Sequence, residues 1–426
     1  MTAVLGIICI VIGFLLGAPL FCVFAAMALL GWHIDETSVS VVGTDIFRLS
    51  SNFILITIPM FTYAGYLLGE SGAPKRLVKL SRALFDVMPG GLAIVSIIAC
   101  SLFTAFTGAS GITIAALGSF LFPALLQDKY SENFSLGLVT TGGSLGLLFA
   151  PSVPLIIYGV ITETPISDMF IAGIIPGLLM LLILCILSVF IAKRDKIPTS
   201  PLKWKDLGAA LWEAKWEIPI PIFVLGGLYG GFIIVSEAAA VTAFWVLIVE
   251  VLIQREISYS QHKKVVKDSM VMVGGILIIM AAALASTNYF IDVDVPMKIF
   301  DFIQRYVSTK VVFLILLNCL LFALGMILDI FSALVVVVPL IMPVAKKYGI
   351  NDVHLGIIFL ANMQIGYLTP PFGMGLFISG YRFNKGIIQT TAACLPFITM
   401  LIGSVLLITY WPDLSLFLLR IMGRPY

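Results

Sequence analysis

Long apolar segments separated by short polar loops run along the chain from Val4 to its last turn. Most are long enough to cross a bilayer, alone or paired across a tight break, since one helical crossing takes roughly 20 apolar residues. None is followed by a region with the helix or strand periodicity of a soluble domain. The pattern predicts an all-α polytopic membrane protein that forms one membrane domain.

Prolines and glycines recur within these segments at one fixed spacing. Four pairs of positions differ by 220: Pro123 and Pro343, Gly146 and Gly366, Pro151 and Pro371, and Pro176 and Pro396. The stretch "GAPKRLVKLSRAL" also corresponds to "VDVPMKIFDFIQRY" in the second half. Such self-similarity is typical of transporters built from two structural repeats. We expect a first repeat over 1–195, a connector over 196–216 and a second repeat over 217–426.

Each repeat shows the same series of predicted elements. Two short apolar helices are followed by one full span, an amphipathic arm, a helix-break-helix, an interrupted span and a final span. In the first repeat these elements are expected at 2–17, 19–32, 51–70, 74–88, 90–126, 133–160 and 170–193. In the second repeat they are expected at 217–233, 236–254, 270–289, 296–309, 310–345, 351–380 and 389–412.

The positions of Lys and Arg predict how the repeats face the membrane, because cytoplasmic loops carry an excess of basic residues. The connector is basic, with Lys193, Arg194, Lys196, Lys203, Lys205 and Lys215 in or beside it. If it lies in the cytoplasm and 217–254 crosses twice, each repeat makes an odd number of passes, about five. The second repeat is then inverted relative to the first, and both termini are periplasmic. Lys346 and Lys347 fall on the periplasmic side, which the rule does not explain.

The helix-break-helix segments 90–126 and 310–345 are each too short for two full crossings. We therefore expect two re-entrant hairpins that enter the membrane from opposite sides. The hairpin tips and the interrupted spans leave backbone groups unpaired at membrane depth, which is tolerated only beside protein or a water-filled cavity. Both repeats thus predict parts of one site near the midplane.

In the first arm, "KRLVKLSRALF", three leucines share one face of a helix, and Lys75, Lys79 and Arg82 lie elsewhere. A helix with this pattern lies in the plane of the membrane interface. Its basic face is expected to contact lipid rather than substrate.

The composition restricts the chemistry of the predicted site. Only 11% of residues are charged, the mean hydropathy is +1.10, and a net charge of +2 gives no indication of a nucleic-acid partner. The six cysteines lie in apolar runs and the three histidines are scattered, so neither a disulfide framework nor a zinc site is expected. No nucleotide-binding motif or intramembrane catalytic pair occurs. We expect a transporter without a bound cofactor, driven by an ion gradient or from outside the chain, rather than an enzyme.

The first hairpin turns at "FTAFTGASG", where Thr104, Thr107 and Ser110 follow one another among small residues. Hydroxyls and free carbonyls at a glycine-rich break supply hard oxygen ligands for Na⁺ and hydrogen bonds for an anionic substrate. The alternative is close helix packing through small residues, which is common in membranes. The break in the helix favours a functional site.

The first interrupted span, "TGGSLGLLFAPSVPLIIYG", contains Pro151, which lacks an N–H and is expected to free carbonyls near Gly146 and Phe149. A proline kink without any ligand is the structural alternative. The pattern recurs as Gly366 and Thr369 in "IGYLTPPFGMGLF", beside a second hairpin. This recurrence favours cation binding over a simple kink.

One acid, Asp329 in "GMILDIFSAL", lies within a long apolar run. A carboxylate inside the membrane is costly and indicates ion coupling or closure of the hairpin over the site. It can equally cap the second hairpin arm by accepting the Phe331 or Ser332 N–H, and the two roles can coexist. Glu237, which follows a tight turn, is expected to be a helix-start acid rather than a ligand.

Five stretches together carry a family resemblance: "FTGASG", "APSVPLIIYG", "GGFIIVSEAAAV", "GMILDIFSALVVVVPLIMP" and "GYLTPPFGMGLF". With them the chain resembles the large membrane subunit of tripartite ATP-independent periplasmic (TRAP) transporters over essentially its whole length. The departures are mild. "IIVSE" stands where a threonine and a proline are common, and "APSVP" has a single proline where two are frequent.

The resemblance implies an elevator transporter of the bacterial inner membrane that takes up organic acids with Na⁺. It also implies that a soluble periplasmic binding protein delivers the substrate and that a small four-helix membrane subunit takes part. Because no segment for that subunit precedes Met1, we expect it to be a different chain. The alternative function is a stand-alone divalent anion/Na⁺ symporter that needs no binding protein.

The resemblance further divides the chain into a scaffold (2–88 and 217–309) and a moving transport domain (90–193 and 310–412). It places one Na⁺ site at Thr104, Thr107, Gly146, Phe149 and Pro151. It places a second Na⁺ site at Gly325, Gly366, Thr369 and Phe372. We expect the substrate, sialic acid or a C4-dicarboxylate, to contact Thr107, Ser110, Asp329, Ser332 and Thr369.

Overall fold

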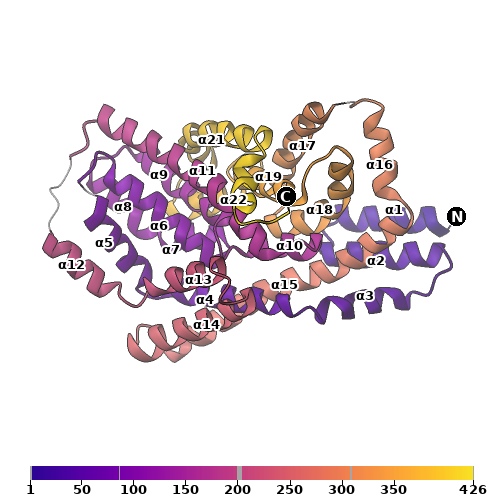
Figure 1. Cartoon of the computed structure of the whole chain (residues 1–426), viewed down its shortest axis with the longest axis horizontal. Coiled ribbons are helices and arrows are strands. Elements are labelled where there is room, and N and C mark those ends of the chain that lie inside the picture. The colour runs from indigo at the N-terminus through magenta and orange to yellow at the C-terminus, as the bar shows by residue number, and fades with distance from the viewer. Residues whose placement is uncertain (1, 86, 199–203, 308, 426) are drawn as a thin grey trace.

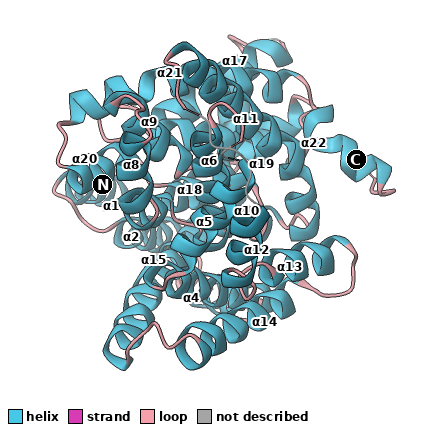
Figure 2. Cartoon of the chain, turned by 90° about the vertical axis from the view of Figure 1, so that its left-hand side faces the viewer, coloured by secondary structure: helices cyan, strands magenta, loops and turns pink. Residues whose placement is uncertain are grey.

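The computed structural model describes residues 2–85, 87–198, 204–307 and 309–425. Every regular element in this part of the chain is a helix, and no strand is present in it (Figures 1 and 2). Lys203, one of the basic residues of the connector, lies outside the described residues. The predicted all-α architecture is confirmed.

The helices of the first repeat follow the predicted order. A pair of short helices, a span and the arm come first, and a hairpin, an interrupted span and a long final helix follow. Their bounds are α1 (Thr2–Leu15), α2 (Leu20–Ile34), α3 (Ser40–Ser50), η1 (Phe53–Ile56), α4 (Thr57–Glu70), α5 (Ala73–Phe85), α6 (Gly91–Thr107), α7 (Ser110–Ala116), α8 (Gly118–Gln127), α9 (Glu132–Gly142), η2 (Leu145–Leu148), α10 (Val153–Thr162) and α11 (Ile166–Arg194).

The second repeat presents the same order after a connector helix. Its bounds, with the connector helix first, are α12 (Trp204–Glu213), α13 (Pro219–Tyr229), α14 (Val235–Leu247), η3 (Ile248–Ile253), α15 (Tyr259–Asp292), α16 (Val295–Gln304), α17 (Lys310–Gly325), α18 (Ile330–Lys347), α19 (Asp352–Gly366), α20 (Met374–Phe383), α21 (Ile387–Tyr410) and α22 (Asp413–Ile421).

The repeat spacing of 220 is visible in the ends of the helices. The second arm of the first hairpin spans 110–127 as α7 and α8, and that of the second hairpin spans 330–347 as α18. α7 and α8 meet at a 50° bend, whereas α18 is continuous. The interrupted spans begin after equivalent N-caps, Ser131 and Asn351, whose side chains accept backbone N–H groups. Two hairpins and two interrupted helices are therefore confirmed.

Seven described helices, or eight if α7 and α8 count as one span, are long and apolar enough to cross a membrane. The other apolar helices, among them α2, α6 and α17, have 10–17 residues. A re-entrant hairpin enters and leaves the membrane by the same face, so neither of its helices has to be long enough to cross the bilayer. The number of passes in each repeat and the inversion of the second repeat stay predictions.

Some helices are missed or shortened by a search for apolar runs. α3, α12 and α22 are amphipathic or polar helices in segments where no helix was predicted. α15 is longer than the predicted 270–289 because Ser258 and Gln261 form a capping box ahead of the apolar run. At the start of α14, by contrast, Glu237 accepts the Ile234 N–H at 3.0 Å, which confirms its predicted role as a helix-start acid.

The basic face of the first arm pairs with carboxylates of the protein, and its expected contact with lipid stays a prediction. Lys79 lies 2.5 Å from Glu213, and Arg82 lies 3.1 Å from Asp128. Arg76 contacts three further carboxylates. The acids that make these pairs come from other parts of the chain, which a helical pattern within the arm does not reveal.

Helices of the two repeats pack against each other in two groups. In one group α2 packs along α15, where Ser286 Oγ donates to the Phe24 carbonyl at 2.6 Å, and α4 packs on α14 (Figure 1). In the other group α7 contacts α20 and α10 contacts α18. Each hairpin thus touches the interrupted span of the opposite repeat. The assignment of these groups to a scaffold and a moving domain stays a prediction.

Candidate functional site

Each hairpin lies against the break of its own interrupted span with main chain close to main chain. A Cβ at Gly146 would collide with the Ser101 oxygen and lie 2.6 Å from the Ala105 nitrogen. A Cβ at Gly366 would lie 2.5 Å from the Cα of Gly325. Gly146 and Gly366 are equivalent positions of the repeat, and so are Ala105 and Gly325, since both pairs differ by 220. Glycine is therefore required at both breaks by the same contact.

The carbonyls at the two breaks are arranged in the same way. The Phe149 N–H donates to the Gly146 carbonyl at 3.1 Å, and the Thr369 N–H donates to the Gly366 carbonyl at 3.0 Å. The carbonyls of Phe149 and Thr369 also accept one backbone hydrogen bond each. These oxygens are thus less free than the prolines suggest, but a carbonyl has two lone pairs and each keeps one for a cation.

Thr104 connects the two arms of the first hairpin to the first interrupted span. Its buried hydroxyl lies 2.8 Å from the carbonyl of Gly143, which follows α9, and 2.7 Å from the Thr113 hydroxyl on α7. Thr107 is also buried, and its nearest polar contact is the backbone of Ala109 at 3.4 Å, which is a weak hydrogen bond. Thr104 therefore has a packing role, while the Thr107 oxygen is available to a ligand.

At the tip of the second hairpin, Asp329 caps α18. Its carboxylate accepts the Phe331 and Ser332 N–H groups at 3.0 Å each and the Ser332 hydroxyl at 2.5 Å. The capping role expected from the sequence is present in this geometry. The hydroxyl proton of Ser332 is already used, so this side chain offers a substrate only its acceptor lone pairs. The equivalent position of the first hairpin is Ala109, which carries no such cap.

Tyr367, in the break after α19, brings the two hairpin tips together. Its hydroxyl lies close enough to the Ser110 side chain and to the Asp329 carboxylate to interact with both. The same hydroxyl lies 3.0 Å from the Met374 sulfur. This tyrosine lies within "GYLTPP", but it was assigned no role from the sequence, because a contact among three segments far apart in the chain leaves no pattern in the local sequence.

Ser152 is a second residue that sequence reasoning missed. It follows Pro151 at the first break, is fully buried, and its hydroxyl has no hydrogen-bond partner among the described residues. A buried hydroxyl without a partner is unfavourable unless a ligand or ion satisfies it. In the repeat, Ser152 is equivalent to Phe372. A polar residue inside the proline-containing break was the available signal.

The two breaks differ in exposure. Around the first break Gly146, Pro151 and Ser152 are all buried. At the second break Pro370 and Pro371 are exposed and Phe372 is 62% exposed. The break in the interrupted span is therefore buried in the first repeat and partly exposed in the second.

The predicted residues fall into two clusters that Tyr367 connects. The first cluster contains Thr104, Thr107, Gly146, Phe149 and Pro151. The second contains Gly325, Gly366 and Thr369, with Phe372 at its exposed edge. Among the described residues no group of three His, Cys, Asp or Glu side chains could hold a metal ion. A cation at either cluster would be held mainly by carbonyl and hydroxyl oxygens.

Comparison with known proteins identifies the family. A family model described as "Tripartite ATP-independent periplasmic transporter, DctM component" matches residues 4–414. A C4-dicarboxylate TRAP transporter large permease protein of Pseudomonas aeruginosa is 31% identical, with 91% of each chain covered. A sialic acid TRAP transporter large permease protein of Vibrio cholerae is 28% identical, with 93% of each chain covered.

Two further similar proteins differ from this chain in length or in sequence. An isethionate TRAP transporter permease protein of Oleidesulfovibrio alaskensis is 33% identical over 87% of this chain, which spans only 59% of that relative. The crystal structure of the YdaH transporter of Alcanivorax borkumensis is similar in fold, with a TM-score of 0.60, 13% identity, and 88% of this chain and 87% of that chain covered. The chain belongs to the tripartite ATP-independent periplasmic transporter family, as a large membrane permease subunit rather than an enzyme.

Proposed function

We propose that this subunit carries out Na⁺-coupled uptake of an organic acid anion across the bacterial inner membrane. The observation that supports this most strongly is the duplicated contact between a hairpin and a break, Gly146 on Ala105 and Gly366 on Gly325. Each contact fixes a set of main-chain oxygens at a non-helical stretch inside the protein. Discontinuous helices of this kind supply ions with carbonyl ligands and anions with helix N-termini.

The two Na⁺ sites follow from the oxygens that remain available. At the first break these are the carbonyls of Gly146 and Phe149, the Thr107 hydroxyl and the unpartnered Ser152 hydroxyl. At the second break Gly366 and Thr369 contribute carbonyls, and the Thr369 hydroxyl donates to the Ile365 carbonyl, which leaves its lone pairs free. Na⁺ is a hard cation, and neutral oxygen ligands suit it without the desolvation of a buried carboxylate.

The anion would lie between the hairpin tips. Ser110 and Tyr367 offer hydroxyl groups there, and α10 and α20 begin directly after the two breaks, so the partial positive charge of each helix N-terminus lies at a break. Asp329 already occupies the N-terminus of α18. We therefore assign Asp329 to closing the second hairpin rather than to direct contact with the anion, since two negative charges repel each other.

The proposal also includes how the substrate reaches the permease and which parts of the permease move. The family resemblance supports delivery by a soluble periplasmic binding protein, assistance from a small membrane subunit, and elevator movement of the hairpins and interrupted spans. The related permeases are named for isethionate, C4-dicarboxylate and sialic acid, so relatedness does not select the acid. We keep sialic acid and a C4-dicarboxylate as the two candidate substrates. The competing proposal is a symporter that works without a binding protein.

Uptake into liposomes tests the proposal. The permease and its small subunit would be reconstituted and supplied with labelled acid, with and without the binding protein and an inward Na⁺ gradient. We expect uptake only when both are present. Uptake without the binding protein would favour the stand-alone symporter. Uptake at the same rate with and without the Na⁺ gradient would refute coupling to Na⁺.

Two variants test the assigned residues in the same assay. Thr369→Ala removes a ligand, so the Na⁺ concentration for half-maximal uptake should rise about tenfold, as for loss of one bond to a charged group. Asp329→Asn should slow uptake while keeping a cap on α18. Thr399→Ala is the matched control, because the Thr399 hydroxyl bonds only carbonyls of its own helix, those of Leu395 and Pro396. Unchanged Na⁺ dependence in Thr369→Ala would place the ion elsewhere.

A further inference from the structure

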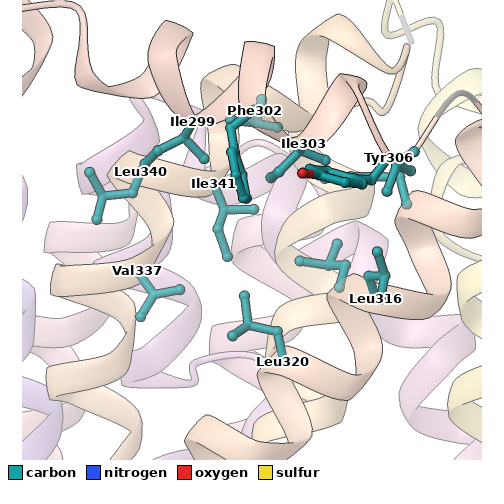
Figure 3. A pocket seen from close by; sticks show the side chains of 13 residues that line it. Ile299, Phe302, Ile303, Tyr306, Leu316, Leu320, Val337, Leu340 and Ile341 are labelled. Atoms are coloured by element: carbon teal, nitrogen blue, oxygen red, sulfur yellow. The ribbon is translucent and has the colours of Figure 1, made fainter.

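An apolar groove separates the second arm from the second hairpin. It has a volume of about 520 Å³ and lies between α16, α17 and α18 (Figure 3). Its wall consists of Ile, Leu, Val and Phe side chains and one tyrosine, Tyr306. Phe302 and Ile303 of α16 point across it toward Leu320 of α17 and Val337 of α18 (Figure 3). The groove is thus formed by the arm on one side and both hairpin helices on the other.

The groove opens to the outside of the protein. Phe302 is 62% exposed, and on the opposite lip Leu316 is 50% exposed and Leu320 is 46% exposed. A wall so apolar offers water no hydrogen-bond partners, so ordered water is a poor filling. In a bilayer the hydrocarbon chains are as apolar as leucine and already surround the protein. A lipid chain is therefore the natural occupant at this depth.

The equivalent place in the first repeat holds a much smaller apolar pocket. There the arm, α5, packs along the first hairpin helix, α6, and the pocket between them has a volume of about 40 Å³. In the second repeat α16 packs on α15 and α18, and the groove of about 520 Å³ lies between it and α17. The two copies of this arrangement therefore differ in the space that they leave between arm and hairpin.

Basic residues surround one end of the groove. At this end Tyr348 donates to the Val307 carbonyl at 2.8 Å, and Lys310 Nζ donates to the Gly349 carbonyl at 2.9 Å, which ties the α16–α17 loop to the end of α18. The exposed basic side chains there are Arg305, Lys310, Lys346 and Lys347. The nearby acids are Asp352, which pairs with Lys346 at 2.9 Å, and Asp301 on α16. The first turn of α17 adds the partial positive charge of a helix N-terminus.

We propose that the groove binds one acyl chain of an anionic phospholipid, whose headgroup phosphate contacts the rim formed by Arg305, Lys310 and Lys347. From the rim the groove follows α17 from Phe313 to Leu320, a rise of about 10 Å, which lies within the roughly 15 Å depth of one leaflet. Apolar contact alone does not select one lipid over another in a bilayer. The preference for an anionic phospholipid comes from the basic side chains of the rim. The proposal also gives a reason for Lys347, which the positive-inside rule leaves unexplained.

Native mass spectrometry of the detergent-purified protein tests this. Phosphatidylglycerol and phosphatidylcholine with identical acyl chains would be titrated separately. We expect one phosphatidylglycerol to be retained in preference to phosphatidylcholine. Each rim charge contributes about fivefold, so Arg305→Gln and Lys347→Gln should each lower that preference about fivefold. Leu320→Trp should weaken the binding of both lipids, because the indole would take up part of the groove between α17 and α18.

Matched variants separate this site from general effects. Lys264→Gln with Lys267→Gln removes exposed charge from α15, and Leu182→Trp enlarges an exposed apolar side chain on α11, so both should bind lipid as the unmodified protein does. An unchanged preference in the rim variants would overturn the proposal. These variants change only exposed side chains, so they remain informative if Leu320→Trp does not fold.

A photo-crosslinking amino acid at position 316 identifies the occupant in native membranes. We expect a phospholipid adduct on the full-length protein. An adduct to another protein chain, whether a small membrane subunit or a second copy, would assign the groove to a protein partner and overturn the lipid proposal. None of these readouts depends on transport, so the lipid site and the proposed function can fail independently.

Discussion

The Arg76 guanidinium lies 2.6 Å from the Glu217 carboxylate, which joins the arm of the first repeat to the segment that opens the second. Glu250 and Glu256 contact the same guanidinium at 3.2 and 2.5 Å. Burial lowers the pKa of Arg76, but the hydrogen bonds and charges of these carboxylates outweigh it and raise the pKa above its ordinary value. Because Glu217 and Glu250 are buried, Arg76 compensates carboxylates that have lost their water.

Replacement of Arg76 should therefore destabilise the protein strongly. Arg76→Met leaves two buried carboxylates without their cation, a change that costs about 3–5 kcal/mol in buried ion pairs. We expect a marked fall in the thermal unfolding midpoint in detergent, and partial recovery when Glu250→Gln is added. Lys79→Met is the control, because the Lys79–Glu213 pair is exposed and should contribute no more than about 1 kcal/mol. Similar shifts for Arg76→Met and Lys79→Met would contradict this account.

A single methyl group at the second break should abolish transport. The Cβ of Gly366→Ala would lie 2.5 Å from the Cα of Gly325, so the hairpin and the interrupted span must separate. We expect loss of Na⁺-dependent uptake and a lower unfolding midpoint. Gly403→Ala on α21 is the comparison, because no atom lies within 4 Å of its added methyl, and alanine favours a helix. Wild-type uptake by Gly366→Ala would show that the close contact is not needed.

Ser152→Ala should affect stability and transport in opposite directions. Removal of a buried hydroxyl without a partner should stabilise the protein by about 1 kcal/mol in the absence of Na⁺. The same change removes an ion ligand, so half-maximal uptake should need several times more Na⁺. Ser404→Ala serves as control, since the Ser404 hydroxyl bonds its own helix at Met400. If Ser152→Ala is destabilising and leaves Na⁺ dependence unchanged, the hydroxyl is structural.

Cysteine labelling should show that the two arms lie on opposite sides of the membrane. In a background without the six native cysteines, Leu84→Cys on α5 and Arg305→Cys after α16 would be tested with a membrane-impermeant thiol reagent. We expect Leu84→Cys to react from the cytoplasm and Arg305→Cys from the periplasm. Reaction of both from the same side would rule out inverted repeats.

The architecture could be predicted from the sequence because prolines and glycines mark the positions at which its helices are interrupted. Pro151 and Pro371 marked equivalent breaks, and the structure places equivalent helix ends around them. Apolar runs located most spans to within a few residues, but they missed the polar N-terminal part of α15. The same search missed α3 and α22, whose amphipathic faces gain stability from packing rather than from continuous hydrophobicity.

The candidate site could be predicted only in part. Gly146 and Gly366 were selected for the carbonyls beside them, and the structure adds that each is needed for a main-chain contact with the adjacent hairpin. Tyr367 was missed because its partners, Ser110 and Asp329, are far away in the sequence. The ion pairs of Arg76 were missed for the same reason, since its three carboxylates come from the second repeat. Local patterns predict helices and breaks, whereas pairings between repeats depend on tertiary packing.

The main-chain contact at each break allows ion binding and substrate recognition to depend on different groups of the protein. Under the proposed function, the oxygens that hold the ion belong to the backbone around Gly146 and Gly366, and their positions depend on the absence of side chains. The groups placed to meet the substrate are the hydroxyls of Ser110 and Tyr367. An exchange of side chains around Tyr367 can therefore change which acid is accepted while the source of energy stays the same.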